Sequence, residues 1–226
     1  MKTQIIYEDK DILVCHKPAG LAVENAAIGR MDMVSELKNY MKSAYLGVVH
    51  RLDQPVEGLL VFAKNQKAAA HLSKQLQQNT LNKEYFAVVC GQPDSAQGRL
   101  VDYLTKDSKT RMAKVVDKEN AEGKEAILEY EVLETIQRDD VELSLLKIQI
   151  QTGRFHQIRA QLSNAGTPIL GDQKYGNEVS DKVSLTTGTK NVALCACSLN
   201  FKHPVTGKNI SFEITPDAGA FGLFLH

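Results

Sequence analysis

The chain has 226 residues, of which 43% are hydrophobic and 24% are charged, as is ordinary for a globular protein that buries a core. Its 27 basic and 27 acidic residues cancel, which argues against a nonspecific polyanion binder but leaves room for a local basic groove. No apolar run approaches the roughly 20 residues that span a bilayer, and the polar N-terminus is unlike a secretory signal. We therefore expect a cytoplasmic protein with no membrane partner.

Hydrophobic periodicity predicts one α+β domain over residues 1–226, with a mixed, mostly antiparallel sheet and flanking helices. A basic run at 105–125 is interleaved with acids, which favours a solvated hairpin over a dedicated binding patch. In chain order, we expect two short strands in residues 3–23, a helix at 31–44, a doubly buried strand at 58–65, a helix at 65–79 capped by Asn65, a strand at 83–91, several strands at 97–151, a helix at 154–166 closed by Gly166, and two final strands at 191–216.

The cysteines predict buried, reduced thiols rather than a metal site. The four are Cys15, Cys90, Cys195 and Cys197, and most of them sit among apolar residues. No C-x-x-C pair and no zinc-type spacing occurs, so we expect neither a metal nor a cofactor.

Three segments offer residues for chemistry. In HRLDQPVEGLLVFAKN, residues 50–65, Asp53 precedes a buried strand, where its environment can tune a carboxylate; the alternative is a solvated surface turn. In the helix at 154–166, Phe155, Ile158 and Leu162 should face the core. Arg159 lies on the neighbouring face, where it would take a carboxylate partner or remain solvated with its stem along the core. Tyr85, in the strand at 83–91, offers an aromatic face or a hydroxyl.

Five motifs in order resemble those of the RluA-type RNA pseudouridine synthases. The stretch HRLDQPVEGLLVFAK resembles the family signature HRLD-x-x-T/S-x-GLLVFAK, and HKPAGLAV is similar to its NKPAG segment. KEYFAVVCG resembles its K-x-Y-x-A-x-V-x-G strand, and QTGRFHQIRAQLSNAGTPILGDQKYG its TGR-x-HQIR block. The ending LCACSLNFKHPVTGK resembles LHA-x-x-L-x-F-x-HP-x-TG. Together the motifs cover nearly the whole chain.

The resemblance implies isomerisation of uridine in RNA to pseudouridine, without a cofactor or metal. It assigns Asp53 as the catalytic aspartate and Arg159 as the basic partner of that carboxylate. Tyr85 would lie against the target base, Ile158 would pack beneath the site, and Arg51 would enter the RNA stack that the flipped uridine leaves. The remaining residues expected to bind substrate are His50, His156 and Gln157.

Several departures from the family pattern concern substrate choice rather than the residues assigned to chemistry. Val56 and Glu57 replace a small polar pair, and Glu57 adds a negative charge near Asp53. Phe155 replaces a Thr or Ser, and Cys195 replaces a His. The first motif begins near residue 12, so we expect a catalytic domain without the N-terminal S4-like RNA-binding domain of many relatives. The expected partner is rRNA or tRNA, not DNA, and the expected state is a monomer.

Two other functions remain open at this stage. One is a catalytically silent RNA-binding or RNA-chaperone module of the same fold, suggested by the Val56–Glu57 departure and the neutral charge. The other is a nucleoside glycosidase, which usually needs a second carboxylate, and Glu57 is the nearby candidate.

Overall fold

The computed structural model describes residues 1–226 except 27–28, 139, 217–218 and 225–226, and it divides into two compact units. Unit 1 comprises Met1–Lys83 and Cys195–Pro216. Unit 2 comprises Glu84–Leu194 with the described part of 217–226. The expectation of a single domain over 1–226 stays a prediction. The expected class, α+β with a mostly antiparallel sheet, is confirmed, because β4 and β10 pair in parallel whereas β1–β2, β2–β4, β3–β4, β10–β11, β5–β9, β6–β7, β6–β8 and β8–β9 pair antiparallel.

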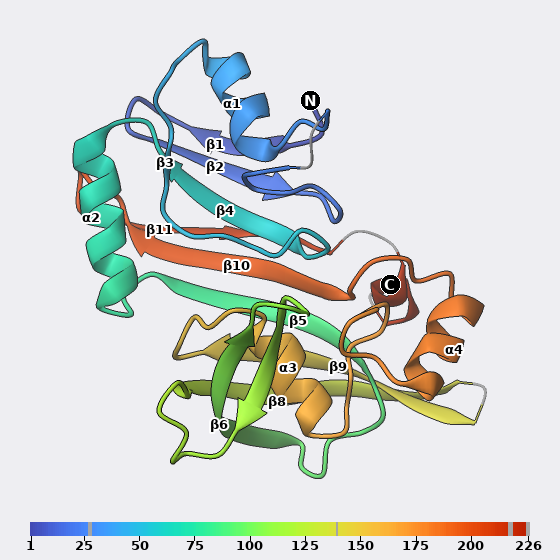
Figure 1. The fold of residues 1–226 in the computed structure, drawn as a ribbon. Helices are drawn as coiled ribbons and strands as arrows, with labels where there is room; N and C mark the ends of the chain where they lie inside the picture. The colour runs from blue at the N-terminus through green and yellow to red at the C-terminus, as the bar shows by residue number, and fades with distance from the viewer. Residues whose placement is uncertain (27–28, 139, 217–218, 225–226) are drawn as a thin grey trace. The chain divides into compact units, whose positions relative to one another are not determined.

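Unit 1 is a sheet with a helix packed on each face (Figure 1). Its strands run in the order β1-β2-β4-β10, with β11 paired to β10 and β3 paired to β4. The elements are β1 (Gln4–Glu8), β2 (Ile12–Lys17), α1 (Met33–Met41), β3 (Gly47–Val48), β4 (Glu57–Ala63), α2 (Gln66–Gln77), β10 (Leu194–Lys202) and β11 (Asn209–Glu213).

Alternation along β4 explains why both faces of this sheet are covered. Leu59 and Val61 point into a core that includes Leu72 of α2, whereas Leu60 and Phe62 point into a core that includes Leu37 of α1. Successive side chains of a strand point to opposite faces, so an unbroken apolar run requires cover on both. The doubly buried strand predicted from the sequence is confirmed.

Gly58 lets β4 approach β10 closely, directly after the segment that carries Asp53. Its φ is +136°, and a Cβ built there would lie 2.5 Å from the backbone nitrogen of Ala196. Gly58 also pairs with Ala196 in the parallel β4–β10 ladder. A side chain would therefore meet backbone that cannot move aside, which explains the glycine in the HRLD-containing motif.

Unit 2 is an antiparallel sheet whose strands run in the order β5-β9-β8-β6-β7. The expected solvated hairpin at 105–125 is the β6–β7 hairpin, and α3 packs against both of its strands. The elements are β5 (Asn82–Cys90), β6 (Gln97–Asp107), β7 (Met112–Val116), β8 (Lys124–Arg138), β9 (Val141–Ile150), α3 (Gln157–Asn164), α4 (Glu178–Thr186) and the short 3-10 helix η1 (Ala220–Leu223).

Local signals placed most helices correctly. Asn65 caps α2, accepting a hydrogen bond from the Ala68 nitrogen at 2.9 Å, and Gly166 follows α3 with a φ of +82°. Sequence reasoning missed α4, although Asn177 and Ser180 form a capping box at its start, a pattern that the sequence displays.

The prediction that Phe155 faces the core was wrong. The helix begins at Gln157 rather than at residue 154, because His156 takes a left-handed conformation with a φ of 52°. That residue interrupts the helical phase, so Phe155 does not continue the buried row of Ile158 and Leu162. Its side chain is 38% exposed instead.

All four cysteines are buried thiols, as the sequence predicts. Burial raises the pKa of the Cys15 thiol to about 12, so this group is unreactive at neutral pH. Among the described residues, no helix combines the length and the hydrophobicity that a membrane crossing requires.

Candidate active site

Asp53 begins a tight turn that leads into β4 of unit 1. The Val56 nitrogen donates to the Asp53 carbonyl at 3.1 Å, and Asp53 is half-buried. The neighbouring Gln54 exchanges two hydrogen bonds with Gly20: the Gly20 nitrogen donates to the Gln54 carbonyl at 2.8 Å, and the Gln54 Nε2 donates to the Gly20 carbonyl at 3.1 Å. The loop of the HKPAG motif thus holds the segment that carries Asp53.

Lys17 is the residue that ties these two loops together, and sequence reasoning gave it no role. Its side chain is fully buried, and its Nζ donates to the carbonyls of Pro18 at 3.0 Å, Leu21 at 2.8 Å and Gln54 at 3.1 Å. An ammonium group has three hydrogens, and here all three have a carbonyl acceptor. The signal in the sequence was the lysine of HKPAG, which stands at the end of a wholly buried strand.

The charge of Lys17 also bears on the acidic groups beside it. Burial lowers the pKa of Lys17 from its ordinary 10.5 to about 8, and the carboxylates of Asp53 and Glu57 partly counteract that shift. Glu57, the departure from the family pattern, is buried at the start of β4. Lys17 therefore places a positive charge close enough to the Asp53 and Glu57 carboxylates to interact with both.

His50 and Arg51 occupy opposite environments. The His50 ring is buried, its Nε2 accepts a hydrogen bond from the Val61 nitrogen at 3.3 Å, and desolvation holds its pKa well below 6.5, so the ring is neutral. Arg51 is exposed, and its guanidinium forms a loose ion pair with Glu24 at 3.5 Å. Such exposed pairs are weak, so Arg51 can leave Glu24 at little cost. The substrate contacts expected for both residues stay predictions.

In unit 2, a carboxylate holds Arg159, and that carboxylate is Asp172. The Arg159 Nε and Nη2 each donate to an oxygen of Asp172 at 2.7 Å, and the exposed fractions of the two side chains are 4% and 0%. Asp172 also accepts from the backbone nitrogens of Lys174 and Tyr175, and the guanidinium lies 5.1 Å from the centre of the Tyr175 ring. A fork-to-fork pair fixes the plane and direction of the guanidinium.

The expectation that Arg159 takes a carboxylate partner is thus confirmed, and the partner that the structure shows is Asp172. The assigned pairing of Arg159 with Asp53 stays a prediction. Sequence reasoning missed Asp172, although it stands in the GD of the QTGRFHQIRAQLSNAGTPILGDQKYG segment, 13 residues after Arg159. The solvated alternative for Arg159 was wrong, because the side chain is buried.

The other residues of unit 2 assigned to the site are largely buried. Tyr85, on β5, pairs with Ile148 of β9, and Ile158 is the second residue of α3. Gln157 accepts from the Thr152 hydroxyl at 2.8 Å and donates to the Ile127 carbonyl at 3.0 Å. These bonds tie Gln157 into the protein, and its expected contact with substrate stays a prediction.

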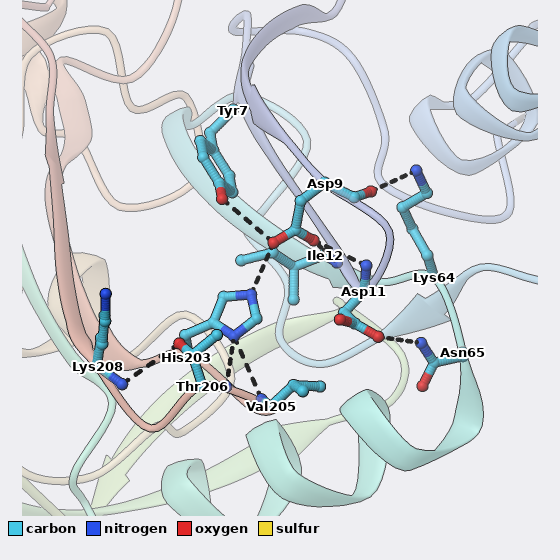
Figure 2. Close-up of polar contacts among 10 residues, drawn as sticks. All are labelled: Tyr7, Asp9, Asp11, Ile12, Lys64, Asn65, His203, Val205, Thr206 and Lys208. Atoms are coloured by element: carbon cyan, nitrogen blue, oxygen red, sulfur yellow. Dashed lines mark hydrogen bonds and ion pairs between the residues drawn. The ribbon is translucent and has the colours of Figure 1, made fainter.

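The structure brings together three residues of metal-ligating types that the sequence spacing did not reveal (Figure 2). One potential ligand atom from each of Asp9, Asp11 and His203 lies within 4.8 Å of the others. One oxygen of Asp11 accepts from the Asn65 amide at 2.9 Å, and the other is buried without a hydrogen-bond partner in the described structure.

The hydrogen bonds of His203 assign this cluster a structural role. Its Nδ1 accepts from the backbone nitrogens of Val205 and Thr206, so the ring proton is on Nε2, which donates to Asp9 at 2.7 Å (Figure 2). A metal bound at Nε2 would require the proton on Nδ1, which would break both bonds of the β10–β11 turn. The cluster therefore joins that turn to the β1–β2 turn, where Asp9 caps two backbone nitrogens.

Comparison with known proteins identifies the family. Residues 11–164 match the family model described as RNA pseudouridylate synthase, and this chain belongs to that family of isomerases. It is 35% identical to the uncharacterized RNA pseudouridine synthase YlyB of Bacillus subtilis, over 94% of this chain and 69% of that protein. It is 33% identical to the ribosomal large subunit pseudouridine synthase D of Zymomonas mobilis, over 93% of this chain and 68% of that protein.

Solved structures support the fold. The human RNA pseudouridylate synthase domain containing 1 superposes with a TM-score of 0.79 at 21% identity, covering 95% of this chain and 83% of that one. The human domain containing 4 superposes with a TM-score of 0.74 at 22% identity, covering 94% and 88%. At this identity the likeness concerns the fold, and the RluA-type motifs remain the link to particular residues.

Replacing Lys17 by Met should loosen the loop that carries Asp53. The substitution keeps the length of the side chain but leaves three carbonyls without their donor, so we expect a loss of about 2–5 kcal/mol in unfolding free energy and a fall in turnover. Urea melts and initial rates on RNA measure the two effects. Lys67→Met, the same change on an exposed position of α2, is the control and should alter neither. Equal behaviour of the two variants would contradict the role of Lys17.

The pKa of about 8 gives Lys17 a recognisable pH dependence. Above pH 8 the folded protein loses the Lys17 proton while the unfolded chain keeps it up to about 10.5, so this group adds stability as pH rises through that interval. Neutral Lys17 has only two hydrogens for three carbonyls, so turnover should fall over the same interval. A turnover profile that stays flat to pH 10 would contradict this prediction.

Asp172→Asn tests the buried pair in unit 2. The substitution leaves the Arg159 charge without its bidentate partner, and breaking a buried pair from one side typically costs about 3–5 kcal/mol. Thermal or urea melts should show that loss, and turnover should fall because the guanidinium is no longer held in one plane. Glu129→Gln, which removes a half-exposed carboxylate of the same unit, should change little. An unaltered melt for Asp172→Asn would show that the pair does not hold Arg159.

Proposed function

We propose that this chain isomerises uridine in RNA to pseudouridine with Asp53 as the catalytic carboxylate. The observation that carries the proposal is the setting of Asp53: it is the aspartate of the HRLD motif, on a turn whose backbone is fixed by Lys17 and Gly20. Membership of the RNA pseudouridylate synthase family supports RNA as the substrate class.

The reaction balances within the substrate. The N1–C1′ glycosidic bond breaks, the detached uracil turns, and a C5–C1′ bond forms in its place. The C5 proton leaves and N1 gains a proton, so the product is an isomer of the substrate. Asp53 acts as the ionised carboxylate, either by attacking the nucleotide covalently or by assisting departure of uracil to a glycal-type intermediate.

The base must leave the RNA stack before this chemistry begins. A stacked uridine does not expose its reacting atoms, so the nucleotide flips into the protein at a cost of a few kcal/mol. We assign Arg51 to the space that the uridine vacates. Its exposure and its weak pair with Glu24 support that assignment, since the side chain can reorient without breaking a buried contact.

Unit 2 supplies the remaining assigned residues. We propose that Tyr85 lies against the uracil ring and serves as a candidate base for the C5 proton, and that Ile158 packs beneath it. Arg159, fixed by Asp172, is assigned as the basic partner that keeps the catalytic carboxylate ionised. His156 is assigned a contact to the RNA.

The RNA to test first is that of the large ribosomal subunit. The relative from Zymomonas mobilis is named as a large-subunit synthase, and so is synthase C of Rickettsia prowazekii, which is 33% identical over 92% of this chain. tRNA is the second substrate class. We propose that the protein acts as a cytoplasmic monomer and does not modify DNA.

Glu57 separates this proposal from the glycosidase alternative. A glycosidase uses a second carboxylate that reaches the substrate or its attacking water. Glu57 is buried, and its charge acts on Lys17, which suits a structural role better than a second catalytic acid. A turnover assay on RNA distinguishes the proposed enzyme from the catalytically silent RNA-binding module.

Asp53→Asn should abolish isomerisation while leaving the fold and the affinity for RNA nearly unchanged. The amide cannot act as a carboxylate, so we expect a loss of at least about a thousandfold in rate. Release of tritium from RNA labelled at uracil C5 measures turnover, and filter binding measures affinity. Asp117→Asn, at an exposed position, is the matched control.

Activity of the Asn variant within tenfold of the wild type would show that Asp53 is not the catalytic group. A wild-type protein that binds RNA but releases no tritium from ribosomal or transfer RNA would favour the silent RNA-binding module. Release of uracil from nucleosides would favour the glycosidase.

A further inference from the structure

Phe155 is an exposed aromatic residue on a turn at the start of α3. Its side chain is 38% exposed, and its neighbours Gly153 and Arg154 are exposed as well. Single apolar residues on a surface are common and need no explanation. Phe155 differs because its ring stacks on His156 and a lysine ammonium lies against it.

The ring is fixed through His156. The Phe155 and His156 rings stack with their centroids 3.8 Å apart and their planes at 21°. The His156 Nδ1 bonds to the Tyr175 hydroxyl at 2.9 Å, and that hydroxyl accepts from the Ala113 nitrogen at 2.6 Å. The Tyr175 hydroxyl thus links the His156 ring to the backbone of the β6–β7 hairpin. His156 also has a φ of 52°, a conformation that persists where the surroundings determine it.

The β6–β7 hairpin places a cation against the same ring. Lys106 pairs with Ala113 in the hairpin, and its Nζ lies 4.7 Å from the Phe155 centroid. Two paired residues of the hairpin are therefore connected to this turn. Lys106 lies against Phe155, and Ala113 is linked to His156 through the Tyr175 hydroxyl. Arg154, the preceding residue, is exposed and is anchored by its Nε to the Glu125 carbonyl at 2.8 Å.

We infer that Phe155 is a stacking site for an unpaired base of the RNA substrate, with Lys106 and Arg154 contacting adjacent phosphates. The inference rests on the proposed function, because it requires RNA as the ligand. An exposed aromatic ring accompanied by exposed cationic residues is a combination that binds single-stranded nucleic acid. Lys106 covers the ring when RNA is absent and moves to a phosphate when a base stacks there, since a cation over an exposed ring is held weakly.

The proposed stacking site lies next in the chain to residues that are assigned to the reaction and to RNA binding. The turn leads directly into α3, the helix of Arg159, and the stack includes His156, which is assigned to bind RNA. Phe155 also replaces the Thr or Ser of the related motif, so a stacking site here would distinguish the substrate choice of this chain from that of relatives with the small residue. Lys106, against the ring, and Arg154, the preceding residue, are both cationic, which favours a nucleic acid over a protein partner.

The test uses a short single-stranded oligouridine that contains one 2-aminopurine, whose fluorescence falls when the base stacks on an aromatic ring. Phe155→Ala should weaken binding by about 5- to 150-fold and remove the quenching, as expected for the loss of one base–aromatic stack. Phe155→Tyr should retain both. Leu185→Ala, at an 83% exposed position of α4, is the control and should match the wild type.

Two further measurements separate stacking from packing. On an RNA that the wild type modifies, Phe155→Ala should raise KM with little change in kcat. In a salt titration, Lys106→Met should reduce the slope of the logarithm of affinity against the logarithm of salt concentration by about 1, as expected for the loss of one phosphate contact. Unchanged affinity and quenching for Phe155→Ala, with a lower melting temperature, would reduce Phe155 to a packing residue and overturn the inference. If the wild type modifies no RNA, the proposed function fails, and the oligouridine titration still decides whether Phe155 stacks a base.

Discussion

The ammonium of Lys17 is the interaction on which the candidate site in unit 1 depends. A charge removed from water is costly unless hydrogen bonds and opposite charges compensate it. Here three carbonyls accept from Nζ, and the carboxylates of Asp53 and Glu57 favour the charged form. Because two of the carbonyls belong to the HKPAG loop and the third to Gln54, the compensation of one charge fixes two loops. Asp53 is the residue next to Gln54.

Unit 2 uses the same principle with the charges arranged differently. The buried cation is Arg159, which forms a fork-to-fork pair with Asp172, and that carboxylate is itself held by two backbone nitrogens. Such a pair adds little net stability compared with a hydrophobic replacement, yet it sets the orientation of the guanidinium. At the adjoining turn, the Tyr175 hydroxyl accepts from the Ala113 nitrogen and bonds to the His156 Nδ1, so a backbone donor again helps to position a polar side chain. In each case backbone groups help to hold a polar side chain in place.

These contacts show where reasoning from the sequence succeeds and where it ends. The doubly buried β4, the Asn65 cap of α2 and the paired strands at the C-terminus follow from patterns within about ten residues, and all were predicted. The start of α3 was misplaced because His156 takes a left-handed conformation that its residue type does not require. Asp172 stood in a recognised motif without a role, because nothing local couples it to Arg159. Asp9 and His203 are 194 positions apart, a distance at which spacing carries no information.

The central proposal for this protein is that Asp53 catalyses the isomerisation of particular uridines in cellular RNA. The most direct measurement maps pseudouridine across total RNA from cells that lack this protein, from cells with the wild type, and from cells with Asp53→Asn. We predict that a small set of positions, first of all in the large ribosomal subunit RNA, loses pseudouridine without the protein and regains it with the wild type alone. An identical map in all three cell lines, or full restoration by the Asn variant, would contradict the account.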